Sequence, residues 1–440
     1  MKPLVNRKFR IAVIGSGVAG LSAAYHLRNE AHVTLYEAEG RLGGHANSIE
    51  VNEKGYTLGL DTAFIVSNTE GYRRFSQFID DTEVGAVEQL AGFEFFDCET
   101  GEHFGSAELG SDEEYIKANF SSEFLSMWRE AQRFYDETPR HFIRRQAEMP
   151  LGEYLDINGY SQEFRHGFVT AISAAVWSVP KDKLFEMPAA TIIAFFYGHG
   201  KNGLGGRDVT WRTVRGGSIS YVRHIRNALV EAGGEVRLAQ PVTEVTQKGD
   251  TVVVETEQGS EEFDYAVVAT HSDDSARMLS KDSRFDVLGC LPYASSKVVL
   301  HTDARQIPID KSWWQAWNYG RKGSDVFCVY YLNNLQQLPE KVSDYFVTVN
   351  PVLEIAPDKV IQEFTYRHPV FSAEVRRRQP EFRAINVDSA NRIKIAGGYL
   401  ATSDDNVDLV GNHEAGFCSG IYAANRIVQE ISTTATEYQG

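Results

Sequence analysis

The sequence is poor in cysteine, in basic charge and in long apolar runs. Its 440 residues contain four cysteines, Cys98, Cys290, Cys328 and Cys418, which lie far apart and lack the spacing of metal ligands. We therefore expect reduced thiols and no metal site. No apolar run reaches the length of a transmembrane helix, and the first ten residues lack the apolar core of a signal peptide. A cytoplasmic location is the expectation.

The charge balance narrows the class of partner. Acidic residues outnumber basic residues by 60 to 44, which gives a net charge of -16. This excess argues against nucleic-acid binding and against an anionic membrane surface, and it leaves a small molecule as the expected partner. The apolar content of 42% suffices for a sizeable core, and the length suits about two domains. The oligomeric state stays open.

The N-terminal stretch carries the most informative pattern in the chain. It consists, in order, of an apolar run at 11–14, the glycines Gly15, Gly17 and Gly20, a helical pattern, an apolar run at 32–36, and the acid Glu37. The order strand, tight turn, helix, strand, acid is typical of a dinucleotide-binding unit. A glycine turn in an ordinary parallel sheet would not explain the acid at its end.

Each residue of this unit has a physical role in that interpretation. Gly15 permits the tight turn, Gly17 lets backbone N–H groups approach a pyrophosphate, and Gly20 lets the helix pack close to the strand. The start of the helix offers unpaired N–H donors and a positive dipole end to the phosphates. Glu37 can accept hydrogen bonds from ribose hydroxyls.

The residues after Glu37 favour FAD over NAD. Arg41 precedes a second glycine pair, Gly43 and Gly44, and His45 follows it. A second glycine pair suggests another close backbone approach to a long ligand, and an arginine can pair with a phosphate. An NAD site of this type has no need for that addition.

The combination G-x-G-x-x-G, then Glu, then R-x-G-G resembles the flavin amine oxidase superfamily. That superfamily contains monoamine oxidases, protoporphyrinogen oxidases and phytoene desaturases. Within it the sequence looks closest to a bacterial group of amine-oxidase-like FAD proteins, through G-G-H-A-N-S, D-T-A-F-I-V, V-V-L-H-T-D and N-H-E-A-G. Members of that group are associated with lipid modification.

The resemblance implies the rest of an FAD site. Thr62, Ala63 and Phe64 would lie along the flavin, with Ala63 where glycine is usual, and the backbone of Val242 would face the adenine. A helix beginning near His413 would point its positive dipole end at the flavin and stabilise its reduced form. No cysteine stands at 398–402, so the FAD should be non-covalent. The remaining expected cofactor contacts are Ala19, Ala38, Gly397, Glu414 and Gly416.

The expected fold is α/β, and α+β when the whole chain is considered. A discontinuous Rossmann-like FAD-binding domain takes 1–75, 205–275 and 385–440. A substrate domain takes 76–204 and 276–384. Within the substrate domain, 111–197 reads as a helical insertion, with one helix ended by Pro180. The stretch 293–371 reads as an antiparallel sheet, and its dense aromatic residues include one expected strand at 313–319.

Two residues are candidates for catalysis. Lys297 resembles the lysine that holds a water at flavin N5 in amine oxidases, although a solvated strand-edge charge is the alternative interpretation. His413 can act as a general base or hydrogen-bond donor, because its ordinary pKa lies near neutrality. A helix N-cap is the alternative role for His413.

Three aromatic residues, Trp313, Trp317 and Tyr330, are the candidates for a substrate pocket wall. Ordinary core packing uses the same residue types, and spacing does not separate the two interpretations. Amine oxidases often place an aromatic residue just ahead of the last helix, where this chain has Asn412 and His413. The aromatic cage that such enzymes build around an amine is therefore incomplete.

The function that follows is an FAD-dependent oxidoreductase. It would transfer a hydride from an apolar substrate of acyl or polyene type to flavin N5, with oxygen or another electron acceptor completing the cycle. An amine oxidase, a redox-neutral flavin-dependent isomerase, and a flavin-binding partner protein without turnover are the alternatives.

Overall fold

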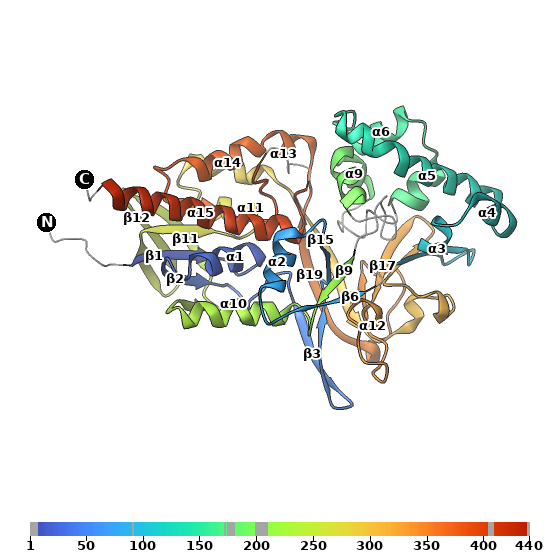
Figure 1. Cartoon of the computed structure of the whole chain (residues 1–440), viewed down its shortest axis with the longest axis horizontal. Coiled ribbons are helices and arrows are strands. Elements are labelled where there is room, and N and C mark those ends of the chain that lie inside the picture. Colours follow the sequence, from blue (N-terminus) through green and yellow to red (C-terminus); the bar gives the residue numbers. More distant parts are fainter. Residues whose placement is uncertain are drawn as a thin grey trace. The chain divides into compact units, whose positions relative to one another are not determined.

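The computed structural model describes residues 8–89, 92–170, 173, 181–198, 210–403 and 409–437. The chain divides into two compact units (Figure 1). The first unit contains Met1–Asn47, Ser218–Pro292 and Glu374–Gly440, and the second contains Ser48–Gly217 and Tyr293–Ala373.

These bounds differ from the expected domains at four places. Residues 48–75 and 205–217 belong to the second unit, and residues 276–292 and 374–384 belong to the first. The physical reason is packing that the local pattern does not reveal. Leu58 and Leu60, for example, are buried in the same cluster as Leu300 and Val347 of the second unit.

A five-stranded parallel sheet forms the centre of the first unit. Its order is β10-β2-β1-β14-β20, and every neighbouring pair is parallel. The apolar runs predicted the central strands, because a parallel sheet covered on both faces needs nearly continuous apolar residues. The strands are β1 (Phe9–Ile14), β2 (Ala31–Tyr36), β10 (Glu235–Arg237), β14 (Tyr265–Val268) and β20 (Ile393–Ile395).

Helices and one small sheet complete the first unit. Figure 1 shows α15 running beside α1. The helices are α1 (Val18–Leu27), α10 (Ile219–Glu231), α11 (Ser272–Met278), α14 (Gln379–Val387) and α15 (His413–Glu437), with a 3-10 segment, η2 (Ser283–Cys290). An antiparallel sheet contains β11 (Val242–Lys248), β12 (Thr251–Thr256) and β13 (Gly259–Phe263). The expected Rossmann-like architecture is confirmed.

A seven-stranded sheet dominates the second unit. Its order is β19-β15-β18-β17-β16-β7-β8. The expected antiparallel pairing holds between 293 and 369, but β7 pairs with β16 in parallel, so the whole sheet is mixed. The strands are β7 (Phe93–Asp97), β8 (His103–Gly105), β15 (Tyr293–His301), β16 (Trp317–Lys322), β17 (Asp325–Tyr331), β18 (Phe346–Val349) and β19 (Val360–Pro369).

One expected strand begins later than the sequence suggests. Aromatic density predicted a strand from Trp313, but Lys311–Trp313 form a short 3-10 helix and β16 starts at Trp317. The cause is local, because the side chain of Asp310 accepts a hydrogen bond from the Ser312 N–H and caps the turn.

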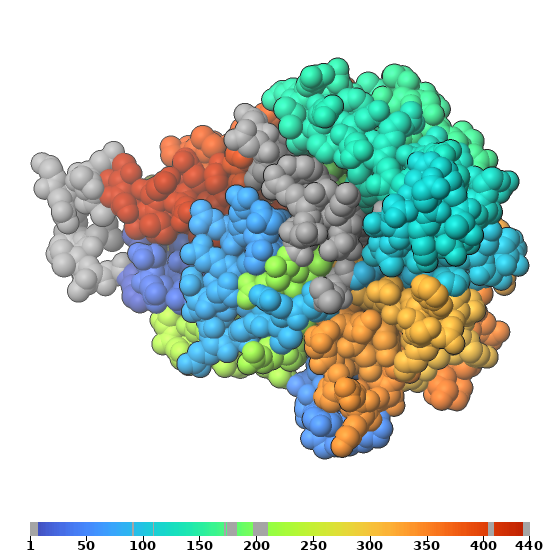
Figure 2. Space-filling view, turned by 45° about the vertical axis from the view of Figure 1, so that its right-hand side comes forward, coloured from blue at the N-terminus to red at the C-terminus, as the bar shows by residue number. Residues whose placement is uncertain are grey.

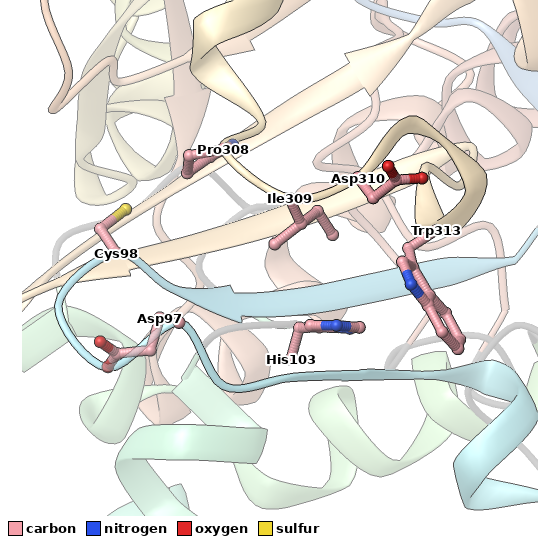
Figure 3. A pocket seen from close by; sticks show the side chains of 8 residues that line it. Asp97, Cys98, His103, Pro308, Ile309, Asp310 and Trp313 are labelled. Atoms are coloured by element: carbon pink, nitrogen blue, oxygen red, sulfur yellow. The ribbon is translucent and has the colours of Figure 1, made fainter.

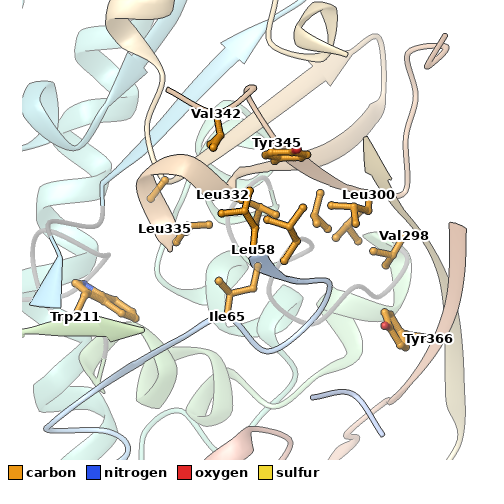
Figure 4. Close-up of a cluster of buried hydrophobic side chains, with 14 residues drawn as sticks. Leu58, Ile65, Trp211, Val298, Leu300, Leu332, Leu335, Val342, Tyr345 and Tyr366 are labelled. Atoms are coloured by element: carbon orange, nitrogen blue, oxygen red, sulfur yellow. The ribbon is translucent and has the colours of Figure 1, made fainter. Parts of the chain in front are cut away.

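Smaller strands pack against the large sheet through an apolar cluster. Figure 4 shows Leu58 facing Leu332 and Leu335, and Trp211 belongs to the same cluster. The additional strands are β3 (Ser48–Glu53), β4 (Tyr56–Asp61), β5 (Val66–Asn68), β6 (Ala86–Gln89) and β9 (Trp211–Val214). Short helical segments also occur, namely α2 (Arg73–Asp80), α12 (Leu332–Leu335), α13 (Ala373–Arg377), η3 (Ala304–Gln306), η4 (Lys311–Trp313) and η5 (Pro357–Lys359).

The helical insertion is confirmed, and its helices form the continuous teal surface in Figure 2. Asp112 and Ser121 cap two of its helices by accepting hydrogen bonds from backbone N–H groups. The helices are α3 (Ser106–Leu109), α4 (Glu113–Asn119), α5 (Ser122–Ile143), α6 (Leu151–Ile157), α8 (Lys181–Glu186) and α9 (Ala189–Gly198). Phe164–Val169 adopt a π-helical turn, and the expected helix end at Pro180 lies outside the described residues.

Two further expectations concern thiols and membranes. All four cysteines lie in the described ranges and none is in a disulfide; Cys328 is buried and the other three are half-buried. Within the described part of the chain, no helix combines the length and apolarity that crossing a bilayer requires.

A buried ion pair joins the central sheet to α15. Lys394 Nζ in β20 lies 2.7 Å from Glu430 Oε1, and the two side chains are 0% and 10% exposed. Burial lowers the pKa of Lys394 and raises the pKa of Glu430, since each charge is removed from water.

Replacing one partner of this pair should destabilise the protein more than replacing both. Lys394→Met leaves the Glu430 carboxylate buried without its cation, and we expect a loss of about 3 kcal/mol. The double variant Lys394→Met/Glu430→Leu should recover most of that loss in urea unfolding. Equal destabilisation of the single and double variants would contradict this account.

Candidate cofactor and substrate sites

The turn before α1 leaves no room for side chains at two of its three glycines. Gly15 has a φ of +94°, and a Cβ there would lie 2.9 Å from the Ala269 carbonyl oxygen. A Cβ on Gly20 would collide with the Gly15 carbonyl oxygen. Gly17, the N-cap of α1, is different, because a Cβ there would meet no protein atom within 4 Å. The space beside Gly17 is therefore open to a ligand.

The carboxylate of Glu37 is held in place at the end of β2. Its Oε2 accepts hydrogen bonds from the Ser16 N–H at 2.9 Å and from the Ser16 hydroxyl at 2.5 Å. Its Oε1 accepts a hydrogen bond from the Glu39 N–H at 2.9 Å. Ala38 lies between these anchored residues.

A second loop approaches the glycine turn from 41–45. The Gly43 N–H donates to the Ser16 carbonyl at 3.0 Å, and a Cβ on Gly44 would lie 3.1 Å from Gly17 Cα. Arg41 donates from Nη1 to the Gly44 carbonyl at 2.9 Å, so it braces this loop. Its predicted pairing with a phosphate stays a prediction.

The first turn of α15 lies against the first turn of α1. Asn412 caps α15, because its side-chain oxygen accepts a hydrogen bond from the Ala415 N–H at 2.8 Å. A Cβ on Gly416 would lie 2.7 Å from Val18 Cγ1. The N-termini of two helices thus lie side by side, and each contributes the positive end of its helix dipole. Such an arrangement suits an anion.

His413 does not provide the N-cap, and burial changes its acid–base behaviour. Its Nε2 lies 3.3 Å from the Tyr221 hydroxyl oxygen. Part of the residue reaches the surface, but desolvation of the imidazole lowers the pKa of His413 to about 3. The ring is therefore neutral at pH 7, which favours hydrogen bonding over proton abstraction.

Several other expected cofactor residues also belong to the first unit. Ala19 lies in the first turn of α1, and Val242 begins β11. The Gly397 N–H donates to the Ser419 hydroxyl at 2.9 Å, which ties the end of β20 to α15. The side chain of Glu414 lies 3.5 Å from the Cys418 thiol.

His45 stacks at a tilt on His271, with ring centroids 5.7 Å apart. His271 also forms, with Asp273 and Asp274, the one group in the described ranges whose ligand atoms lie close enough together to hold a metal ion. Nothing else in the structure points to a metal there, so the group has no assigned role.

The first unit therefore fits a dinucleotide. The open space at Gly17, the free N–H groups of α1 and the anchored Glu37 carboxylate match the needs of a pyrophosphate and a ribose. Ser16 connects these parts, since it bonds both to Glu37 and to Gly43.

The D-T-A-F stretch belongs to the second unit. The Thr62 hydroxyl lies 2.6 Å from the Tyr366 hydroxyl, and Phe64 packs edge-on against Phe75 at 5.4 Å. Ala63 packs against the apolar cluster of Figure 4. The expected flavin contacts of Thr62, Ala63 and Phe64 stay predictions.

Lys297 forms an ion pair across the sheet. Its Nζ in β15 lies 2.8 Å from Glu363 Oε1 in β19, and both side chains are 53% exposed. This geometry is the one expected of a solvated strand lysine, which was the alternative interpretation. The catalytic role of Lys297 is not tested by this contact.

Trp317 and Tyr330 share one face of the large sheet. They are direct partners in the β16–β17 pairing, as are Tyr319 and Cys328 two residues along. Because side chains alternate between the faces of a strand, all four lie on the same face. On the other side of β16, Phe93 of β7 is the parallel partner of Trp317. An aromatic sheet face is therefore present.

Tyr135 of α5 belongs with this face, although the sequence analysis missed it. Burial raises the pKa of Tyr319, and the neighbouring Cys328, Tyr330 and Tyr135 add to that rise. The Tyr135 hydroxyl is buried without a hydrogen-bond partner. Alternation along β16 could have identified Tyr319, but only the tertiary structure brings in Tyr135.

Trp313 lies apart from the aromatic sheet face, in a surface pocket. Its ring is 5.0 Å from the ring of His103, and the residue is 41% exposed. Figure 3 shows the two side chains next to each other in a pocket of about 280 Å³ that Asp310 and Ile309 also line. Trp313 occupies this position because Lys311–Trp313 form a 3-10 helix instead of the expected strand.

The comparisons with known proteins identify the family. The family model of the flavin containing amine oxidoreductases matches residues 18–334, so the chain belongs to that family. Members of this family are flavin-containing oxidoreductases that use FAD.

Curated relatives match over short stretches. Protoporphyrinogen oxidase 2 of Arabidopsis thaliana is 38% identical over 82 residues, which cover 18% of this chain and 15% of that protein. A 4,4'-diapophytoene desaturase of Staphylococcus aureus (strain MRSA252) is 26% identical over 153 residues, covering 33% and 30%. The matched stretches thus span less than a third of the length of each relative.

Solved structures match over nearly the whole chain and show the fold. A putrescine oxidase triple mutant superposes with a TM-score of 0.70 at 14% identity, covering 96% of this chain and 99% of its own. The CLA-producing fatty acid isomerase from P. acnes superposes with a TM-score of 0.63 at 14% identity, covering 97% and 99%.

Substitutions at Gly17 and Gly20 should separate cofactor binding from folding. Gly17→Ala places its methyl group in open space, so the apoprotein should unfold at an unchanged temperature while FAD binding weakens at least about tenfold. Gly20→Ala collides with the turn, so it should lower the unfolding temperature of the apoprotein itself. Calorimetry of the apoproteins and FAD titration measure the two effects. Unchanged FAD affinity in Gly17→Ala would contradict the assigned cofactor space.

The depressed pKa of His413 predicts the pH dependence of flavin reduction. Because the folded-state pKa lies near 3, His413 keeps one protonation state between about pH 5 and pH 9. The variant His413→Gln should therefore leave the shape of the pH profile unchanged, even if the rate falls. Loss of an ionisation near neutral pH in stopped-flow profiles of this variant would contradict the prediction.

Proposed function

We propose that the protein oxidises an apolar substrate of acyl or polyene type. In that reaction FAD, when bound, accepts a hydride at N5. The second unit supplies the surface for the substrate, and the observation that carries the proposal is the aromatic sheet face made by Trp317, Tyr319 and Tyr330, with Tyr135 beside it.

The chemistry of this face favours a neutral substrate over an ammonium ion. Burial raises the pKa of Tyr135, Tyr319 and Tyr330, so these phenols are uncharged at pH 7. Among the paired positions on β16, β17 and β7 that share the face, Asp97 of β7 carries the one carboxylate, and it already accepts a hydrogen bond from Arg321 Nε at 2.6 Å. Removing an ammonium ion from water without a compensating anion is costly, so a charged amine gains little here.

The unpaired hydroxyl of Tyr135 supports one polar contact within an otherwise apolar surface. A buried hydroxyl without a partner is unfavourable, and a substrate oxygen would satisfy it. An acyl chain with a carbonyl or carboxyl oxygen meets both requirements. Lys297 and His413 remain our proposals for catalytic residues, with neutral His413 acting as a hydrogen-bonding group.

We further propose that FAD binds without a covalent bond to cysteine. The residues between β20 and α15 that the structure describes contain no cysteine. Cys418 lies inside α15, one turn after Glu414. This leaves the backbone contacts of the glycine turn and the Glu37 carboxylate as the principal anchors.

A redox-neutral isomerase is the second candidate. Its support is the likeness in fold to the fatty acid isomerase together with a 32% identity over 80 residues to a polyenoic fatty acid isomerase of Ptilota filicina, which covers 18% of this chain and 15% of that protein. Both functions place an acyl chain on the same aromatic face. They differ in whether the flavin stays reduced.

Anaerobic reduction of the purified yellow protein separates the candidates. We expect unsaturated fatty acids or their esters to bleach the flavin absorbance, and simple alkyl amines to leave it unchanged. An altered double-bond pattern without lasting bleaching would identify the isomerase. Rapid bleaching by amines alone would overturn the proposal in favour of an amine oxidase.

The variant Tyr135→Phe gives the matched control for substrate recognition. The substitution removes one hydroxyl and keeps the ring. Because one hydrogen bond to the substrate is lost, KM for an oxygen-bearing acyl substrate should rise about fivefold to tenfold. The FAD content and the unfolding temperature should not change.

A further inference from the structure

The ends of α5 and α6 expose two isoleucines. Ile143 is 78% exposed and Ile157 is 66% exposed, and these are the two most exposed large apolar side chains in the described residues. Single exposed apolar residues are common on protein surfaces, so exposure alone assigns no role. The surroundings of these two residues are unusual for this chain.

Arginines surround Ile143. Arg140, Arg144 and Arg145 are all exposed, and no acidic residue occurs between Glu137 and Glu148. Arg140, Ile143 and Arg144 have the spacing that places side chains on one side of a helix. No ion pair of these three arginines occurs in the part of the chain that the structure describes. A local excess of positive charge thus stands out in a chain of net charge -16.

A hydrogen bond holds the two helix ends together. His141 Nδ1 in the last turn of α5 lies 2.6 Å from the Tyr154 hydroxyl of α6, and the two rings pack edge to face at 5.9 Å. Ile157 follows Tyr154 by one helical turn. We name Arg140, Ile143, Arg144 and Arg145, at and just after the end of α5, the arginine–isoleucine patch; α5 belongs to the teal surface in Figure 2.

We propose that the arginine–isoleucine patch docks on the surface of an anionic lipid bilayer. Guanidinium groups pair with lipid phosphates in a fork geometry, and aliphatic side chains next to them insert at the boundary of the acyl chains. The net charge of the chain repels such a surface, so docking depends on the local positive charge of this patch. This inference goes beyond the proposed function and needs no knowledge of the substrate.

The proposal differs from the expectation drawn from composition. The net charge argued against an anionic membrane surface, but a charge sum describes the field at long range. At a salt concentration near the physiological value, charges act over about 8 Å. The three arginines of the patch, rather than the net charge of the chain, therefore determine the electrostatic attraction at the point where the patch contacts the lipid surface.

Sedimentation of the FAD-loaded full chain with lipid vesicles tests the proposal. We expect binding to vesicles of phosphatidylcholine with about one third phosphatidylglycerol, and none to phosphatidylcholine alone. Ile143→Glu and the double variant Arg144→Gln/Arg145→Gln should each weaken binding at least about tenfold. Raising the salt to about 0.5 M should release the protein.

The variant Val387→Glu provides the matched control. Val387 is 53% exposed but lies in α14 of the first unit, so vesicle binding should be unchanged. All variants alter exposed side chains, and an unchanged flavin spectrum and unfolding temperature verify that they fold.

Three outcomes would overturn the proposal. They are absence of binding to the anionic vesicles, binding that Ile143→Glu leaves intact, and Ile143-dependent dimers in gel filtration without vesicle binding, which would assign the patch to a second copy of the chain. None of these outcomes depends on which substrates bleach the flavin, so failure here is distinguishable from failure of the proposed function.

Discussion

The close contact between α1 and α15 is the constraint on which the first unit depends. A Cβ on Gly420 would collide with the Ala19 carbonyl oxygen, and the Ser22 hydroxyl donates to the Phe417 carbonyl at 2.8 Å. The helices therefore touch through their backbones, and this contact aligns their first turns. Both N-termini then present their positive dipole ends at one place without any cationic side chain, which suits the pyrophosphate of FAD. Farther along α15, the buried Lys394–Glu430 pair fixes the same helix to the central sheet.

Ser16 connects the start of α1 to the loops around Glu37 and Gly43. Its N–H and hydroxyl hold Glu37, and its carbonyl holds the Gly43 N–H. One residue thus connects the glycine turn, the Glu37 carboxylate and the second glycine loop. These groups are in position before a ligand arrives, which reduces the ordering cost of binding. The cofactor half of the molecule is consequently defined by backbone geometry together with the side chains of Ser16 and Glu37.

The sequence could predict features whose causes are local in the chain, and it could not predict features that depend on distant residues. The glycine turn, Glu37 and the parallel strands were predictable, because their causes are local in the chain. The start of β16 was not, since the Asp310 cap competes with the strand propensity of Trp313. The pairing of Lys297 with Glu363 and the position of Tyr135 depend on residues far away in the sequence. No spacing rule reaches across such distances, so the substrate side of the candidate site was only partly predictable.

Under the proposed function, the second unit recognises its ligand through interactions of a different kind from those of the first unit. Its aromatic sheet face is neutral, because burial keeps the phenols protonated, and its polar contacts are few. Discrimination between ligands then depends on the cost of leaving a buried hydroxyl such as that of Tyr135 unpaired, or of stripping water from a charge that finds no partner. The first cost favours an apolar molecule with one oxygen, and the second disfavours an ammonium ion. Under the proposed function, a fold that also occurs in a putrescine oxidase thus serves an uncharged substrate, and the aromatic sheet face accounts for that preference.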